Sequence, residues 1–317
     1  MSDKPPGVVV IGAGHNGLTS AFYLAKAGHK VQILERRDTV GGCAVTEEID
    51  PANAPGCRVS TASYMASMLR PEVIRDMQLA RHGLKMIAAD PGLQIALPDG
   101  QVLPWWSDDK RTHEELSRFN RRDADTFFQL DQDLKALARF LQPFFLEPPP
   151  DTEATGLAGL LEMIRVGRRF RGLNGRQISE LITFLTGSLE QFLDRYFESE
   201  EAKRLILSNN LYGNHGGPKD PGSAMGLLFH LLSGGEDGKQ GFSGHVIGGM
   251  GAITQAMAAA CREAGVEIRT GAEVERIESV NGRAAGISLV GGESVEADIL
   301  VSNADPKRTF LGLVDPG

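Results

Sequence analysis

The sequence has few cysteines, no long apolar run and no excess of basic residues. Its three cysteines, Cys43, Cys57 and Cys261, form no CxxC pair, which excludes the dithiol motif of disulfide reductases and argues against a zinc site. We therefore predict no metal ligands. No run approaches the ~20 apolar residues of a membrane-spanning helix, and the first residues, MSDKPPG, resemble neither a secretory signal nor a transit peptide. These absences predict a cytoplasmic protein.

The charge balance is acidic. Lys and Arg total 33 and Asp and Glu total 41, which gives a formal net charge of -8. Nucleic-acid binding needs a clustered excess of Lys and Arg over much of one face, so we predict no nucleic-acid partner. The 317 residues, with 41% hydrophobic residues and 38 glycines, are typical of a soluble globular protein with about two domains, or with one domain that carries a large insertion.

The first forty residues predict a strand, a helix and a second strand. Residues 8–11 form a β-branched run of the kind that is buried on both faces of a parallel sheet. Apolar residues then recur at helical spacing over residues 16–27, and Gly28 provides a stop. Residues 30–34 predict the second strand, which ends at Glu35.

The rest of the chain predicts a discontinuous domain with an insertion. Helical patterns begin at a capping box formed by Thr112 and Glu115 and continue to about residue 232. The α/β pattern returns after residue 245, with a last buried strand over residues 297–301. We predict an α/β fold in which a Rossmann-like nucleotide-binding domain (residues 7–70 and 240–305) is interrupted by a mixed, mainly helical substrate domain (71–239), with residues 306–317 beginning a C-terminal part.

A glycine motif directly after the first strand predicts a dinucleotide site. Gly12, Gly14 and Gly17 match GxGxxG and open the helix, whose first N–H groups can bind a pyrophosphate. Glu35 ends the second strand and is placed to accept hydrogen bonds from ribose hydroxyls. His15 lies inside the loop, where its imidazole can hydrogen-bond the cofactor.

A second glycine pair favours FAD over NAD. Arg36 follows Glu35, and Gly41 and Gly42 come only a few residues later, so a second close backbone approach lies beside the first. A second close approach suits a cofactor that is longer and bulkier at its pyrophosphate end than one that the first loop alone would hold. An NAD-dependent dehydrogenase would leave the second pair without a role. Cys43, next in the chain, is expected to be a small buried residue.

Several stretches resemble the flavoproteins with two dinucleotide-binding domains, the group that includes amine oxidases and carotenoid desaturases. The resemblance rests on GAGHNGL, on the acidic strand end with its GG pair, and on residues 60–64, 69–72, 82–84, 248–252 and 300–304. It implies that FAD is the cofactor and that the backbone of Val274 faces the adenine. The cofactor-binding residues expected are Gly12, Gly14, His15, Gly17, Glu35, Arg36, Gly41, Gly42, Val274 and Asn303.

The resemblance also bears on the C-terminal part. Members of that group continue past this point with further substrate-domain sequence and a glycine-rich segment that closes over the flavin. Residues 306–317 are therefore expected to begin a truncated part. The sequence leaves open whether this chain is a fragment or pairs with a partner that completes the flavin site.

The function expected is that of an FAD-dependent oxidoreductase of the desaturase or dehydrogenase type. It would oxidise an apolar small molecule by hydride transfer to flavin, and because the flavin accepts the hydride we assign no catalytic residue. A non-catalytic dinucleotide-binding or regulatory protein, or an inactive fragment, is the alternative. No oligomeric state is predicted.

A run of arginines over residues 164–176 allows two interpretations. The run is interleaved with apolar residues, as in a basic amphipathic helix that makes a peripheral contact with an anionic membrane. A solvated helix face in the inserted domain is the interpretation that the sequence favours.

Overall fold

The computed structural model describes residues 7–145, 147–151, 153, 155–210, 216–232 and 244–314. The chain divides into two compact units, which are described separately. Unit 1 is made of Met1–Ile87 and Gly244–Gly317, and unit 2 of Ala88–Ser243. None of the helices within the described ranges is both long and apolar enough to cross a membrane.

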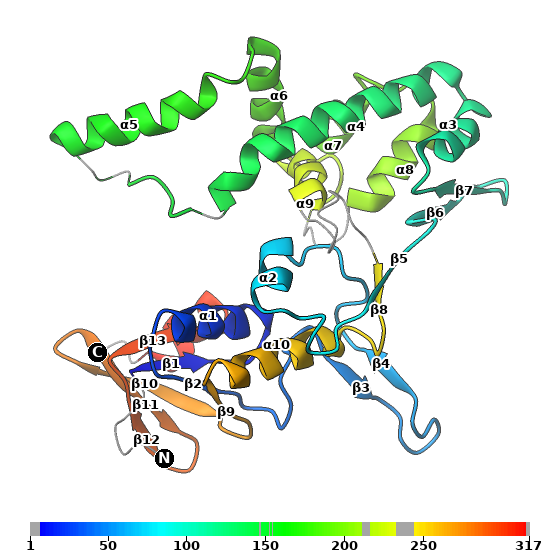
Figure 1. Ribbon diagram of the computed structural model, residues 1–317. Helices are drawn as coiled ribbons and strands as arrows, with labels where there is room; N and C mark the ends of the chain where they lie inside the picture. The colour runs from blue at the N-terminus through cyan, green and yellow to red at the C-terminus, as the bar shows by residue number, and fades with distance from the viewer. Residues whose placement is uncertain are drawn as a thin grey trace. The chain divides into compact units, whose positions relative to one another are not determined.

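A four-stranded parallel sheet lies at the centre of unit 1 (Figure 1). Its order is β13 (Ile299–Ser302), β1 (Val8–Ile11), β2 (Val31–Leu34) and β9 (Glu267–Arg269), and all neighbours run parallel. All four residues of β1 and of β2 are buried, as expected for strands covered on both faces. The predicted α/β class with a parallel sheet is thus confirmed.

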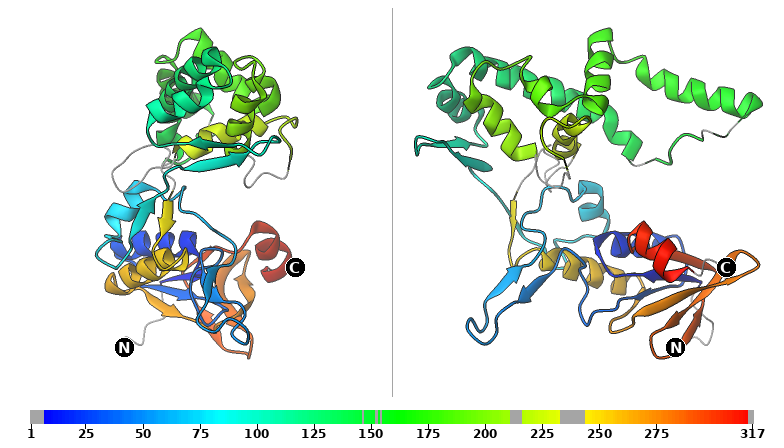
Figure 2. Two further views of the ribbon diagram at one scale, coloured as in Figure 1. Left: turned by 90° about the vertical axis from the view of Figure 1, so that its right-hand side faces the viewer. Right: turned by 180° about the vertical axis from the view of Figure 1, so that it is seen from behind.

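Different layers cover the two faces of this sheet. Val8 and Val10 share one core cluster with α1 and α10, whereas Val9 and Ile11 share another with β10 and β11. This alternation follows from the two-residue period of a strand. The views from three sides agree that the helices lie along one face (Figure 1 and Figure 2). The covering elements are α1 (His15–Lys26), α10 (Gly251–Glu263), β10 (Val274–Val280), β11 (Arg283–Leu289) and β12 (Ser294–Glu296).

Smaller elements complete unit 1. A hairpin and α2 precede β5. The chain leaves unit 1 at β5 and returns to it at β8, and these two strands pair with each other. A short α11 and a π-helical turn (Thr309–Leu313) follow β13. The bounds are β3 (Thr46–Glu48), β4 (Arg58–Ser60), α2 (Pro71–Asp76), β5 (Met86–Ala88), β8 (Gly244–Val246) and α11 (Pro306–Arg308).

Unit 2 is mainly helical. Over the described residues it contains one hairpin and seven helices, and its core includes Phe184 and Phe192, whose ring centroids lie 4.6 Å apart. The elements are β6 (Leu93–Ala96), β7 (Val102–Trp105), α3 (Asp109–Ser117), α4 (Arg121–Leu141), α5 (Gly156–Phe170), α6 (Gly175–Thr186), α7 (Leu189–Leu193), α8 (Glu200–Asn210) and α9 (Gly226–Leu232), with short 3-10 turns at Gln142–Phe145 and Ser223–Met225.

The boundaries differ from those expected. Residues 71–87 belong to unit 1 rather than to the insertion, because Ile74, Met77 and Leu79 pack into the core beneath α1 and α10. The expected restart at residue 240 and the last residues, 315–317, lie outside the described part of the chain. The predicted capping box was wrong, since Asp108 caps α3 by accepting from the N–H of Lys110.

Candidate functional site

The loop between β1 and α1 is closely packed at its glycines. Gly12 has a φ of +94°, in the left-handed region that favours glycine. A Cβ on Gly17 would lie only 2.2 Å from the carbonyl oxygen of Gly12, so no side chain fits there. Gly14 is the N-cap residue of α1, and among the described residues no side chain caps this helix. The first N–H groups of α1, which begins at His15, are thus available to an anion.

Glu35 lies behind this loop and is 6% exposed. One carboxylate oxygen accepts from the N–H of Ala13 at 2.8 Å, and the other from the N–H of Arg37 at 3.0 Å. The carboxylate therefore connects the loop after β1 to the loop after β2. A carboxylate can accept about four hydrogen bonds in total, so capacity remains for the hydroxyls of a ligand.

The second glycine pair lies against the first loop. Gly41 donates its N–H to the carbonyl oxygen of Ala13 at 3.0 Å, and Gly14 and Gly41 form an isolated parallel bridge. Gly41 and Gly42 have φ values of +139° and +57°. A Cβ on Gly42 would lie 3.2 Å from the Cα of Gly14. The two glycine loops thus form one continuous strip of backbone at the carboxyl edge of the sheet.

Asn303 brings the end of β13 to the same strip. Its N–H donates to the carbonyl oxygen of Ile11 at 2.9 Å. A Cβ built on Gly14 would lie 2.9 Å from the side-chain Nδ2 of Asn303, and one built on Gly17 would lie 3.1 Å from it. The amide of Asn303 therefore packs directly on the glycine loop.

Val274 is the first residue of β10, and hydrogen bonds hold the backbone just before it against Glu35 and Arg37. Gly271 donates its N–H to the carbonyl oxygen of Arg37, and Ala272 donates to that of Glu35, each at 2.8 Å. Two residues later the side chain of Val274 is buried in the core against β1 and β2. The backbone at the start of β10 is thus fixed next to the residue that ends β2.

Three members of the predicted set are exposed, namely His15, Arg36 and Gly42. His15 keeps contact with water, but nearby protein atoms desolvate its imidazole and lower its pKa below the ordinary value of 6.5. At neutral pH the ring is therefore uncharged, with one donor and one acceptor. The structure thus brings Gly12, Gly14, Gly17, Glu35, Gly41, Gly42 and Asn303 together, with His15 and Arg36 at the open side and Val274 beside Glu35.

Three hydroxyl side chains support the site and were not expected. The N–H of Met250 donates to Oγ of Ser60 at 3.0 Å, and that of Gly251 to Oγ1 of Thr46 at 2.9 Å, so the β3–β4 hairpin caps α10. Oγ1 of Thr254 donates at 2.8 Å to the carbonyl oxygen two residues beyond the glycine pair. These contacts join segments about two hundred residues apart in the chain, and no local pattern marks them.

Cys43, directly after the glycine pair, is exposed. The expectation that it is buried was wrong, because the backbone of the pair turns toward Ala13 and Gly14 and leaves the next side chain facing water. Within the described residues no group of three or more His, Cys, Asp and Glu could hold a metal ion. A helix N-terminus, a strip of approachable backbone and a buried carboxylate together suit a nucleotide with a pyrophosphate and a ribose diol.

The chain is similar in sequence to known proteins. A family model described as flavin containing amine oxidoreductase matches residues 17–308. The Mus musculus pyridine nucleotide-disulfide oxidoreductase domain-containing protein 2 is 36% identical over 321 residues, covering 96% of this chain and 54% of the mouse protein. The phytoene desaturase (neurosporene-forming) of Rhodobacter capsulatus is 26% identical over 310 residues, covering 96% and 54% of the two chains.

A solved structure shares the fold. An oxidoreductase from Methanosarcina mazei matches with a TM-score of 0.59 at 20% identity, covering 96% of this chain and 60% of that one. The resemblance drawn from the sequence is confirmed by the family match and by the two relatives. The chain spans about half the length of the curated relatives that it matches.

Proposed function

The chain belongs to the flavin containing amine oxidoreductase family, and on that premise we propose that unit 1 is a Rossmann-like domain that binds the ADP half of FAD. The observation that carries the proposal is the joining of the two glycine loops, in which the N–H of Gly41 donates to the carbonyl oxygen of Ala13. A Cβ on Gly14 would lie 2.9 Å from Nδ2 of Asn303, and one on Gly42 would lie 3.2 Å from the Cα of Gly14, so side chains at these positions would crowd the joined loops.

Each residue of the site has a role that follows from its position. Gly12, Gly14 and Gly17 let the pyrophosphate approach the N–H groups of α1. Glu35 accepts hydrogen bonds from the ribose hydroxyls with the capacity left by its two backbone donors. The residues at the rim of the site are Gly41, Gly42 and Asn303 near the pyrophosphate, His15 and Arg36 on the solvent side, and Val274 with its backbone toward the adenine.

The reaction proposed is oxidation of an apolar small molecule. When bound, FAD supplies the acceptor for a hydride. The likeness to a phytoene desaturase supports a substrate and a reaction of this type, and unit 2 would be the inserted substrate domain. The described residues of unit 1 hold the cofactor and orient it, and no proton transfer is assigned to a side chain.

Cofactor binding is tested by titration of the cofactor-free chain with FAD, ADP and NADH. We expect FAD to bind with one equivalent per chain, ADP to compete with it, and NADH to bind at least tenfold more weakly. Glu35→Ala should reduce FAD binding at least tenfold, because the ribose acceptor and the anchor of the loop are both lost. The control is Glu267→Ala, an exposed glutamate of β9 that should leave binding unchanged. A chain that takes up no FAD would refute the proposal.

Catalysis is tested separately from binding. Anaerobic addition of candidate apolar substrates to the flavin-loaded protein should bleach the flavin absorbance. Stable FAD binding without bleaching by any substrate would favour the non-catalytic alternative. Preferential binding of NADH would instead favour a nicotinamide-dependent enzyme.

A further inference from the structure

Helix α5 of unit 2 presents an apolar stripe to solvent. Figure 1 shows α5 projecting from the other helices of this unit, and none of its residues, all of which the structure describes, is buried. Apolar side chains occur at i, i+3, i+4 and i+7, which places them on one side of the helix. They are Leu157, Leu160, Leu161 and Ile164, with 73%, 54%, 59% and 42% of their surfaces exposed.

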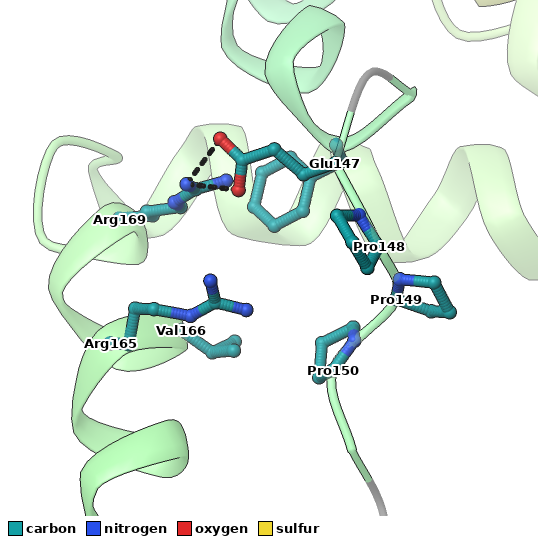
Figure 3. Close-up of a pocket in the computed structure, with 8 residues that line it drawn as sticks. Glu147, Pro148, Pro149, Pro150, Arg165, Val166 and Arg169 are labelled. Atoms are coloured by element: carbon teal, nitrogen blue, oxygen red, sulfur yellow. Dashed lines mark hydrogen bonds and ion pairs between the residues drawn. The ribbon is translucent and has the colours of Figure 1, made fainter. Parts of the chain in front are cut away.

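The opposite side of α5 is occupied by contacts within unit 2. Figure 3 shows Arg165, Val166 and Arg169 directed toward the segment that contains Glu147. One guanidinium nitrogen of Arg169 lies 2.7 and 2.6 Å from the two carboxylate oxygens of Glu147. Arg165 pairs with Glu162 at 2.6 Å. The charges of these two arginines are thus balanced away from the apolar stripe.

The other arginines of residues 164–176 are either paired with acidic residues or exposed. Arg176 pairs with Glu180 at 2.8 Å and lies 3.7 Å from Asp133. Arg168 and Arg171 are exposed, and among the described residues the structure gives neither an acidic partner. Arg168 and Arg171 lie 11 and 14 residues after Leu157, the first residue of the apolar stripe. At helical spacing these positions fall on the same side as the stripe, so the two arginines continue it.

We propose that this stripe is a binding surface for an anionic phospholipid bilayer. The lipid face is defined as Leu157, Leu160, Leu161, Ile164, Arg168 and Arg171. Its apolar side chains would enter the boundary between headgroups and acyl chains, and its two arginines would contact lipid phosphates. Charge complementarity selects this occupant, since the face carries two cations and no acid although the whole chain has a net charge of -8.

A second copy of the chain fits the face poorly. In a symmetric pair of such faces, each arginine would meet either an apolar side chain or another arginine, because the face contains no carboxylate. Such a pair would bury two uncompensated charges per protomer, which is strongly unfavourable. The proposal narrows the sequence-based hypothesis for residues 164–176 to one side of α5 and its C-terminal arginines. It does not depend on cofactor binding.

The test is sedimentation of the 317-residue chain with vesicles. We expect binding to phosphatidylcholine vesicles that contain about one third phosphatidylglycerol, and much weaker binding to phosphatidylcholine alone. Arg168→Gln with Arg171→Gln should weaken partitioning about 30-fold, since each arginine near an anionic surface contributes about a factor of five. Arg165→Gln with Arg176→Gln removes the same charge from ion-paired positions and should change partitioning less than about threefold.

A second variant pair tests the apolar part. Leu160→Gln with Ile164→Gln should weaken binding to the same vesicles at least tenfold, and Leu161→Trp should give a blue-shifted emission when vesicles are added. All substituted side chains are exposed, so the thermal transition should be retained. The proposal is overturned by no binding, by equal binding to neutral vesicles, or by equal losses in the two arginine pairs. It is also overturned if Leu161→Trp shifts without vesicles as the chain dimerises.

Discussion

At Gly17 the backbone leaves no room for a side chain. We expect Gly17→Ala to destabilise the protein by about 2 to 4 kcal/mol, because the added Cβ would overlap the carbonyl oxygen of Gly12 and force the loop apart. The variant should also lose FAD. Urea denaturation and the ratio of flavin to protein measure the two effects.

The matched control is Gly167→Ala. Gly167 lies inside α5, where a Cβ would meet no atom within 4 Å. The substitution should therefore stabilise the protein by up to about 1 kcal/mol through helix propensity. Equal destabilisation by the two alanines would contradict the steric argument.

His15 should make stability depend on pH. Its pKa is lowered in the folded protein, so well above the ordinary histidine pKa of about 6.5 neither the folded nor the unfolded state binds the proton and stability is unaffected. As the pH falls through that value, the unfolded chain binds the proton first and stability declines, until the pH drops below the folded-state pKa. In cofactor-free protein, His15→Asn should therefore gain stability relative to wild type between about pH 7 and pH 5. Parallel urea midpoints over this range would disprove the effect.

The glycines could be predicted residue by residue because their constraint is local. A strand followed at once by a helix needs Gly12 and Gly17 whatever the rest of the chain does. The contacts of Glu35 with the N–H groups of Ala13 and Arg37 depend on the pairing of β1 with β2, which spacing alone does not give. The packing of Asn303 on the loop depends on β13, and only the family resemblance pointed to it.

At the scale of elements, Cys261 of α10 is buried where this helix packs on α1. Its thiol is buried, its sulfur lies 3.2 Å from the carbonyl oxygen of Leu18, and burial raises its pKa to about 12. Cys43 and Cys57 are exposed. We expect a thiol reagent such as DTNB to modify two cysteines rapidly at mildly alkaline pH, and Cys261 only in guanidinium chloride. Rapid reaction of all three in native protein would contradict the packing.

Asp123 joins α4 to α8 in unit 2. Its carboxylate is 1% exposed and accepts from the N–H groups of Glu198 and Ser199 and from Oγ of Ser199, just before α8 begins. Asp123→Ala should cost about 3 kcal/mol, because buried donors lose their acceptor. Thermal unfolding measures this.

Asp125→Ala, two positions along the same helix, is the control for Asp123→Ala. Its carboxylate is largely exposed and pairs only with His113 among the described residues, so we expect a loss below about 1 kcal/mol. Similar losses in the two variants would show that the α4–α8 contact contributes little.

Helix positions were easier to predict than helix ends. The apolar spacing predicts the helices of unit 2, but Thr112 was mistaken for a cap. In the fold Thr112 is buried and its Oγ1 accepts from the N–H of Trp106, while Asp108 caps α3. The ion-pair partners of the arginines could not be predicted from the sequence either, since Glu147 lies 22 residues before Arg169.

At the scale of the whole molecule, unit 1 is made from both ends of the chain. The sequence predicts this discontinuity because the α/β pattern stops and returns, but it misplaces the first boundary. Residues 71–87 contain a short helix, and helical residues alone do not reveal which core they join. Ile74 and Met77 complete the core of unit 1.

The discontinuity predicts that unit 2 can be removed. β5 and β8 are neighbours in one small sheet, so Ala88 and Gly244 can be joined by a short Gly/Ser linker. We expect the shortened protein to unfold in a single transition and to bind ADP within about threefold of the parent affinity. An insoluble product, or one without a cooperative transition, would show that unit 1 needs unit 2 to fold.

The position of β1 between β2 and β13 has a consequence for biosynthesis. β2 leaves the ribosome soon after β1, but Ile299–Ser302 of β13 are nearly three hundred residues away. At translation rates of about 5–20 residues per second, one edge of β1 waits roughly 15 to 60 s for its partner. During that time the nascent chain exposes an apolar strand with unpaired N–H and C=O groups, a target for chaperones and for aggregation.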